Sequence, residues 1–80
     1  MLQIIQTLVK AIVDHPEQVR VEQVEGAHGV IYEVRVAPDD LGQVIGRGGR
    51  TANAMRAVAR AAGAKTGQNV WIDVNRLPEE

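Results

Sequence analysis

Apolar and polar residues follow regular spacings along most of the chain, and the spacing changes from segment to segment. In residues 2–12 the apolar positions recur every three or four residues with polar residues between them, which predicts an amphipathic helix. We expect this helix to end before Pro16, because the residue that precedes a proline is disfavoured in the helical conformation. Alternation over 19–22 and stricter alternation over 30–36 predict two strands. The turn at 25–29 is short enough for these strands to pair as a hairpin.

The next segment predicts two helices around a glycine-rich turn. Proline and acidic residues at 37–40 suit the opening of a short helix. Glycines at 46–49 end this helix, and a longer helix follows over 50–62 with Gly63 as its natural terminator. The apolar side of the short helix carries Leu41, Val44 and Ile45. The expected apolar face of the longer helix comprises Ala54, Met55, Val58, Ala61 and Ala62.

These elements predict the fold class and the extent of the domain. Alternation over 70–74 predicts a last strand, so the element order is α-β-β-α-α-β. This order indicates an α+β domain in which the helices pack on one face of a three-stranded sheet. We expect a single domain over residues 1–76 and a frayed acidic tail over 77–80, because 80 residues leave no room for a second core.

The composition argues against catalysis and against a bound metal. The chain has no cysteine and no serine, so hydroxyl nucleophiles outside Tyr32 are limited to three threonines. His15 and His28 stand alone, and Asp39 with Asp40 is interpreted as a helix-opening charge pair. We therefore expect no enzyme activity, cofactor, metal site or small-molecule substrate. Because neither a signal sequence nor an apolar run of bilayer length is visible, we expect a cytoplasmic protein without membrane insertion.

The glycine turn Gly46-Arg47-Gly48-Gly49 is the first candidate for a binding site. Glycines adopt backbone conformations that other residues avoid, and they let another chain approach closely. The turn also leads into a helix N-terminus, where free N–H groups and the helix dipole favour an anion such as a phosphate. The spacing matches neither a P-loop nor a dinucleotide-binding fingerprint. A tight turn that needs glycine for steric reasons alone is the alternative interpretation.

The distribution of charge is the second candidate feature. Between Leu41 and Ile72 the chain has five basic residues and no acidic one, so this segment carries +5 while the remainder carries −6. The basic residues include Arg47 and Arg50, which we expect to surround the glycine turn with positive charge. A solvated helix face is the alternative interpretation of such a run. A nearly neutral protein with a basic surface around an anion-suited turn is better explained by nucleic-acid binding.

Val44-Ile45-Gly46-Arg47-Gly48-Gly49-Arg50-Thr51, set between two helices, resembles the core motif of a KH domain. The leading helix and strand resemble the type II arrangement, and the length together with the A-P-D-D-L-G lead-in resembles the KhpA family of small bacterial stand-alone KH proteins. The resemblance implies that the G-x-x-G turn clamps the backbone of about four single-stranded nucleotides. It also implies a shallow groove for the bases, lined by Val44, Ile45 and part of Val34 or Val36. The RNA-binding residues implied by the resemblance are Gly46, Arg47, Gly48, Gly49, Arg50, Val44, Ile45, Asn53 and Arg56.

The same resemblance implies a function and partners. It implies a single-stranded RNA-binding protein that acts as an RNA chaperone or post-transcriptional regulator, with a link to cell shape and envelope homeostasis. It further implies a homodimer or a heterodimer with a second KH-containing protein, KhpB. The alternative is a protein-interaction (dimerisation) module whose glycine turn packs on a partner chain. Trp71 is out of phase with its apolar neighbours, so it is predicted either to form a partner surface or to be covered by the tail or the first strand.

Overall fold

The computed structural model describes residues 1–78 and confirms the predicted order of elements. Short 3₁₀ turns at Pro16–Gln18, Pro38–Asp40 and Arg47–Gly49 connect the regular elements. The first strand is longer than the prediction, and the third helix continues well beyond its predicted end. The helices and strands are α1 (Leu2–Ile12), β1 (Arg20–Gly26), β2 (Gly29–Val36), α2 (Leu41–Ile45), α3 (Arg50–Thr66) and β3 (Val70–Arg76).

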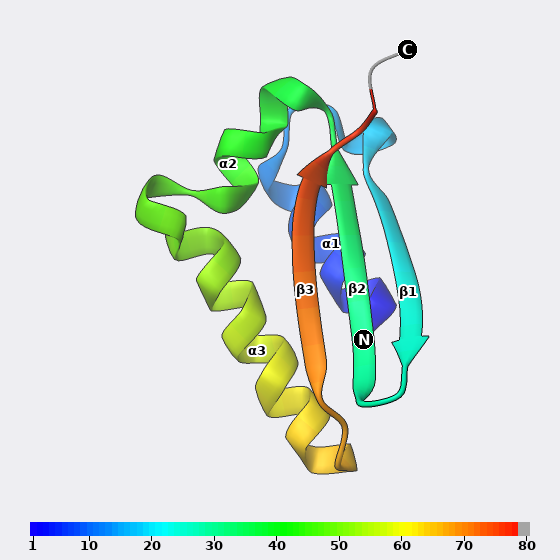
Figure 1. Cartoon of the computed structure of the whole chain (residues 1–80). Coiled ribbons are helices and arrows are strands. Elements are labelled where there is room, and N and C mark those ends of the chain that lie inside the picture. Colours follow the sequence, from blue (N-terminus) through cyan, green and yellow to red (C-terminus); the bar gives the residue numbers. More distant parts are fainter. Residues whose placement is uncertain (79–80) are drawn as a thin grey trace.

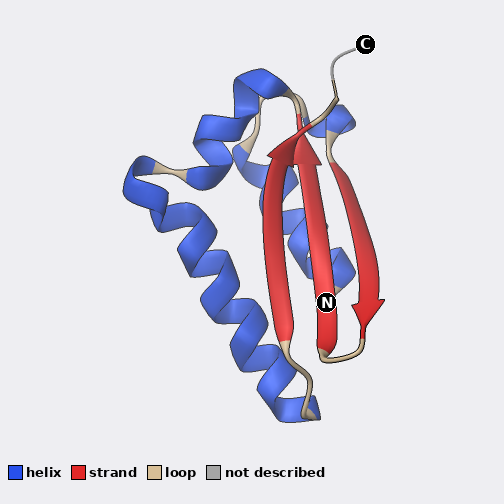
Figure 2. Cartoon of the chain, in the orientation of Figure 1, coloured by secondary structure: helices blue, strands red, loops and turns tan. Residues whose placement is uncertain are grey.

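The sheet has three strands in the order β1-β2-β3. β1 and β2 form the predicted antiparallel hairpin, whereas β3 pairs with β2 in parallel. Parallel neighbours need a crossover connection, and α2 with α3 supplies it. The helices lie on one side of the sheet, and the opposite face is left uncovered (Figure 1, Figure 2). The fold is therefore an open α+β sandwich with β1 and β3 as its two edge strands.

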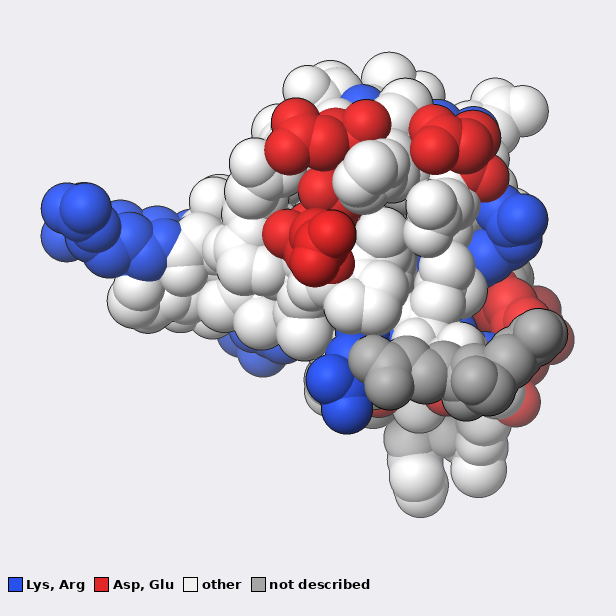
Figure 3. Space-filling model, turned by 90° about the horizontal axis from the view of Figure 1, so that it is seen from above, with Lys and Arg blue, Asp and Glu red and all other residues white. Residues whose placement is uncertain are grey.

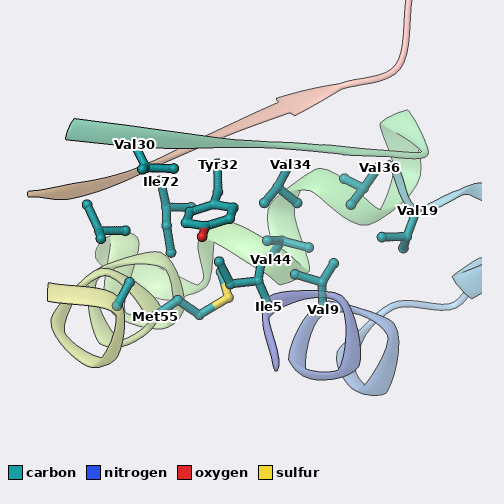
Figure 4. Packing of buried hydrophobic residues seen from close by; sticks show 12 residues of the cluster. Ile5, Val9, Val19, Val30, Tyr32, Val34, Val36, Val44, Met55 and Ile72 are labelled. Atoms are coloured by element: carbon teal, nitrogen blue, oxygen red, sulfur yellow. The ribbon is translucent and has the colours of Figure 1, made fainter. Parts of the chain in front are cut away.

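The core lies between the sheet and the helices. Alternate residues of the central strand β2 point inward, which explains the strict alternation in the sequence. Tyr32 lies in this layer between β2 and the helices, so its predicted place in the core is confirmed (Figure 4). α1 buries Ile5 and Val9 and packs Leu2 against the core, while Ile4, Leu8 and Ile12 stay exposed. The core cluster comprises Ile5, Val9, Val19, Val30, Tyr32, Val34, Val36, Val44, Met55, Ala59, Val70 and Ile72.

The buried face of α3 differs from the predicted one. The side chain of Val58 is 53% exposed, and Ala54 and Ala61 are exposed as well. Alanine is too frequent along this helix for hydrophobicity to mark one face, so the pattern in the sequence was ambiguous. Small residues face β3 because they let the helix backbone approach the strand closely. The buried residues of α3 are Ala52, Met55, Ala59 and Gly63.

Gly63 is a packing residue, and its predicted role as a helix terminator is wrong. It lies inside α3, and a Cβ at this position would lie 2.6 Å from Val70 Cγ2 and 2.7 Å from the Gln68 carbonyl oxygen. The helix ends instead at Gly67, whose φ of 74° suits a left-handed C-cap.

We predict that Gly63→Ala lowers the free energy of unfolding by ~1–3 kcal/mol, because the added methyl group overpacks the α3–β3 contact. Gly42→Ala is the matched control, since a Cβ at this helical glycine meets no atom within 4 Å. We expect the control to be neutral or slightly stabilising, because alanine favours helix. Urea unfolding of both variants measures the difference, and equal midpoints would contradict the packing role.

Asp40 is completely buried, in contrast to its exposed neighbour Asp39. Its carboxylate accepts hydrogen bonds from the backbone N–H of Asp14 (3.1 Å to Oδ1) and of His15 (3.0 Å to Oδ2). Both acidic residues lie at the start of a helical segment, as the sequence predicts, and the Asp40 carboxylate has these additional hydrogen bonds. Asp40 connects the segment that follows α1 to the start of α2.

The C-terminal segment and Trp71 can be placed on the same sheet. Leu77 lies in the predicted tail, yet its N–H donates to the Val36 carbonyl oxygen (2.8 Å). Residues 79–80 of that tail lie outside the described residues. Trp71 is 42% exposed on the uncovered face of the sheet, and β2 separates it from the first strand. None of the helices in residues 1–78 has the length and apolar character needed to cross a membrane.

Candidate nucleic-acid interface

The α2–α3 turn has a backbone that only glycine adopts easily. Gly46, Gly48 and Gly49 have φ angles of 77°, 65° and 79°. The N–H of Gly46 donates to the Gly42 carbonyl oxygen (2.9 Å), and that of Gly49 donates to the Gly46 carbonyl oxygen (3.1 Å). The N–H of Arg50 donates to the Arg47 carbonyl oxygen. These bonds fold residues 46–50 into a compact turn that begins α3.

The two ends of the turn differ in how much space surrounds them. A Cβ at Gly46 would overlap Thr51 Oγ1 and would lie 2.9 Å from the backbone nitrogen of Thr51. A Cβ at Gly48 would meet no atom within 4 Å. The steric interpretation of the glycines therefore explains Gly46, which packs on the first turn of α3. Gly48 and the exposed side chain of Arg47 face outward, where a ligand can approach the backbone.

Arg56 and Asn53 form a linked pair beside the turn. Arg56 Nη1 donates to Asn53 Oδ1 (3.1 Å), and Arg56 Nε donates to the Ile72 carbonyl oxygen (3.2 Å). The second bond satisfies an outward carbonyl of the edge strand β3 and ties α3 to it. Arg56 thus has a structural role as well as a positive charge at the predicted site. The sequence showed its charge but gave no sign of this bond across sixteen residues.

The apolar part of the predicted groove is corrected by the structure. Val44, Val34 and Val36 are completely buried, so their side chains offer no surface to a base. The resemblance to a KH domain implied that they line a groove, but Val34 and Val36 belong to β2, the central strand of the sheet. The strand beside α3 is β3, as the Arg56 bond shows. Ile45 is the member of the predicted apolar set that reaches the surface, with 37% of its side chain exposed.

The projecting end of the molecule carries basic side chains and no acidic ones in the view of Figure 3, although other basic side chains lie on the body. Figure 3 shows basic side chains at the end where Figure 1 places the α2–α3 turn, while acidic side chains lie over the adjoining body. Arg47 and Arg50 are exposed, and neither takes part in an ion pair among residues 1–78. Within the same residues, no three side chains of the metal-ligating types come together. The turn therefore combines accessible backbone with two free guanidinium groups, which suits an anionic ligand.

The order and pairing of the elements define the type II KH fold. A leading helix and strand precede the hairpin partner, and the glycine turn lies in the crossover to the parallel strand. A crystal structure of Era from Aquifex aeolicus has the same fold, with a TM-score of 0.62 at 13% identity over 98% of this chain and 31% of the Era chain.

The family model described as "KhpA/KhpB, KH domain" matches residues 3–74. A protein named RNA-binding protein KhpA from Clostridium acetobutylicum is 42% identical over 92% of this chain and 99% of its own length. A protein of the same name from Mycobacterium tuberculosis is 47% identical over 88% of this chain and 84% of its own length. One from Leifsonia xyli is 51% identical over 84% of this chain and 86% of its own length. The chain belongs to the KhpA/KhpB family of KH-domain proteins. The predicted resemblance is confirmed.

Proposed function

We propose that this protein binds single-stranded RNA through the α2–α3 turn and catalyses no reaction. The observation that carries the proposal is the exposed Gly48 backbone flanked by the unpaired guanidinium groups of Arg47 and Arg50. The relatives that share its family are named RNA-binding proteins, which supports the same ligand. The turn holds the phosphate backbone, because backbone N–H groups and arginines both favour phosphate oxygens.

The predicted site residues have three roles in this proposal. Gly46, Gly49, Asn53 and Arg56 shape and support the turn, whereas Arg47, Gly48, Arg50 and Ile45 contact the RNA. Val44 holds α2 in place from inside the core. Since contacts to phosphate carry no sequence information, we expect modest affinity, weak base preference and a strong dependence on salt.

The proposal predicts that Arg47→Asp/Gly48→Asp, which we call the turn variant, strongly weakens RNA binding. It places two carboxylates where phosphates lie, and its exposed positions leave the core unchanged. We expect an affinity loss of about tenfold or more, because charge-assisted hydrogen bonds contribute ~1.5–3 kcal/mol each. Fluorescence anisotropy with a labelled single-stranded RNA pool measures the loss. For each neutralised phosphate, the wild-type association constant should fall by ~0.7 log units per tenfold increase in salt concentration.

The matched control is Arg20→Asp/Gln23→Asp, which changes the net charge by the same amount on β1, at the opposite edge of the sheet. We expect this control to retain most of the RNA affinity, and circular dichroism verifies that both variants are folded. Equal losses in the two variants would show that overall charge, and not the turn, governs binding. No binding by the wild type would contradict the proposal for the isolated chain.

We further propose that the protein works as a dimer, either with itself or with a second KH-containing protein such as KhpB. The observation that favours a second chain is an apolar surface between α1 and α3, where Ile4, Leu8, Ile12 and Val58 are 53%, 42%, 39% and 53% exposed. A hollow of about 200 Å³ between these helices is lined mainly by apolar side chains. A second copy raises the effective concentration of a weak RNA site.

The cellular role that fits this site is that of a cytoplasmic RNA chaperone or post-transcriptional regulator, with the effect on cell shape and envelope homeostasis that the family resemblance implies. A clamp with weak base preference suits many RNAs rather than one. A pure protein-interaction module is the alternative, and it predicts that the turn variant loses partner binding while RNA binding is absent throughout.

A further inference from the structure

The uncovered face of the sheet carries an apolar row across all three strands. Val24 pairs with Ile31 in the register of β1 and β2, and Ile31 pairs with Trp71 in that of β2 and β3. Val24 and Trp71 are each 42% exposed. Beside them is a hollow of about 430 Å³, lined by Ile31, Trp71, Asp73 and the turn between β1 and β2. Exposed tryptophan beside a hollow is typical of a surface that receives another molecule.

The next row on the same face is acidic, which defines the kind of molecule that fits. Glu22, Glu33 and Asp73 occupy neighbouring register positions. Arg35 lies 3.6 Å from Glu33, but Glu22 and Asp73 have no ion-pair partner among residues 1–78. The unpaired carboxylates of Glu22 and Asp73 repel phosphate, so this row does not suit RNA. Arg20 and Arg35 form the row beyond it, and Arg35 offsets the charge of Glu33. A cationic group that can lie on an indole ring and reach a carboxylate suits it well.

A guanidinium group meets both requirements. It stacks on the face of tryptophan through cation–π attraction and donates paired hydrogen bonds to carboxylates. The α2–α3 turn, which lies at the projecting end of the molecule (Figure 1), offers such a group on a narrow support, because Arg47 stands between two glycines. Within one molecule this turn lies far from the hollow, because the hollow is beside the N-terminal end of β3 (Figure 1).

We infer that the uncovered sheet face of one molecule binds the α2–α3 turn of a second copy, with Arg47 on Trp71 and beside Asp73. The contact is heterologous, because the two molecules use different surfaces. It rests on charge complementarity between a row with two unpaired carboxylates, Glu22 and Asp73, and a turn with two unpaired arginines. If the turn binds RNA as proposed above, RNA and the second copy compete for the same turn. Binding of RNA then dissociates the two copies.

A complementation experiment tests the inference with the protein alone. The turn variant lacks the donor surface but keeps the face. Trp71→Ala/Asp73→Asn, which we call the face variant, lacks the receiving surface but keeps the turn. Each variant by itself should lose the association that the wild type forms beyond any α1–α3 dimer, whereas an equimolar mixture should recover that association. A dimer through the α1–α3 surface would form in every sample, so it cannot produce this pattern.

The readouts separate the contact from general attraction. Trp71 is the only tryptophan of the sequence, so the face variant has none. The tryptophan fluorescence of the mixture therefore comes from the turn variant alone and reports on its intact face. We expect that emission to shift on mixing, and the pair to dissociate between roughly 0.01 M and 1 M salt, as the Debye length falls from about 30 Å to about 3 Å. Arg47→Lys in the face variant preserves charge, and we expect a several-fold weaker pair because lysine lacks the planar group.

Each outcome bears on the inference. Recovery in the mixture, loss in each variant alone and displacement of wild-type association by single-stranded RNA support it. Absence of low-salt association in the wild type, or a mixture that behaves like its separate components, overturns it. If the face variant loses RNA affinity, the face binds RNA and the inference is also wrong. Because the association is measured without RNA, its failure leaves the proposed RNA site untouched, and failure of RNA binding leaves the association measurable.

Discussion

Replacing Asp40 by alanine is expected to lower the free energy of unfolding by ~2–4 kcal/mol. The substitution leaves the N–H groups of Asp14 and His15 without their acceptors, and hydrogen bonds to a charged group contribute ~1.5–3 kcal/mol each. The carboxylate is completely buried, so water does not replace it easily. The effect is large for a domain of this size, because small domains have a total stability of about 5–15 kcal/mol.

The adjacent residue supplies the control for this prediction. Asp39 is exposed and has no hydrogen bond through its side chain in the described part of the chain, so Asp39→Ala should change stability by less than about 0.5 kcal/mol. Asp40→Asn should lie between the two, because the amide keeps one acceptor oxygen but turns an NH₂ group toward a backbone donor. Urea unfolding at neutral pH gives the three midpoints. Similar midpoints for Asp39→Ala and Asp40→Ala would show that the buried carboxylate does not hold the two segments together.

Replacing Gly46 by alanine is expected to damage both stability and RNA binding. The φ angle of 77° with ψ of 170° is strained for a residue with a side chain, at a cost of ~1–3 kcal/mol. The new methyl group would also collide with Thr51, including its backbone nitrogen, which no side-chain rotation relieves. We expect a total destabilisation of ~2–4 kcal/mol, because overpacking adds its own ~1–3 kcal/mol and the turn yields in part.

Gly48→Ala separates strain from collision. It shares a positive φ of 65° but meets no neighbouring atom, so it should cost only ~1–2 kcal/mol. Thr51→Ala in the Gly46→Ala background should recover part of the loss, because it removes the overlapping hydroxyl. Thermal unfolding and RNA-binding anisotropy of the wild type, Gly46→Ala, Gly48→Ala and Gly46→Ala/Thr51→Ala check the expected order of stability and RNA affinity. If Gly46→Ala and Gly48→Ala behaved alike, the packing of the turn on α3 would have no role.

The sequence predicted the elements most reliably where one periodicity covered a whole segment. The alternation of β2 predicted its burial correctly, since a strand at the centre of the sheet has one face wholly against the helices. The buried face of α3 was predicted wrongly, because alanines are distributed almost evenly around this helix. Only the tertiary structure shows which of its residues face β3. The glycine turn was found because three glycines in four residues are rare outside a special backbone.

The motif and the order of elements are properties of the sequence by itself. From them follow the α+β class and the position of the turn, because each depends on residue type and spacing along the chain. The resemblance of the same motif and element order to KH domains adds the type II KH fold and the family. Contacts between distant residues were decided only by the tertiary structure. These are the hydrogen bonds of the buried Asp40 carboxylate, the Arg56 bond to β3 and the row that aligns Trp71 with Ile31. No local pattern encodes them, because each arises when segments far apart in the chain pack together.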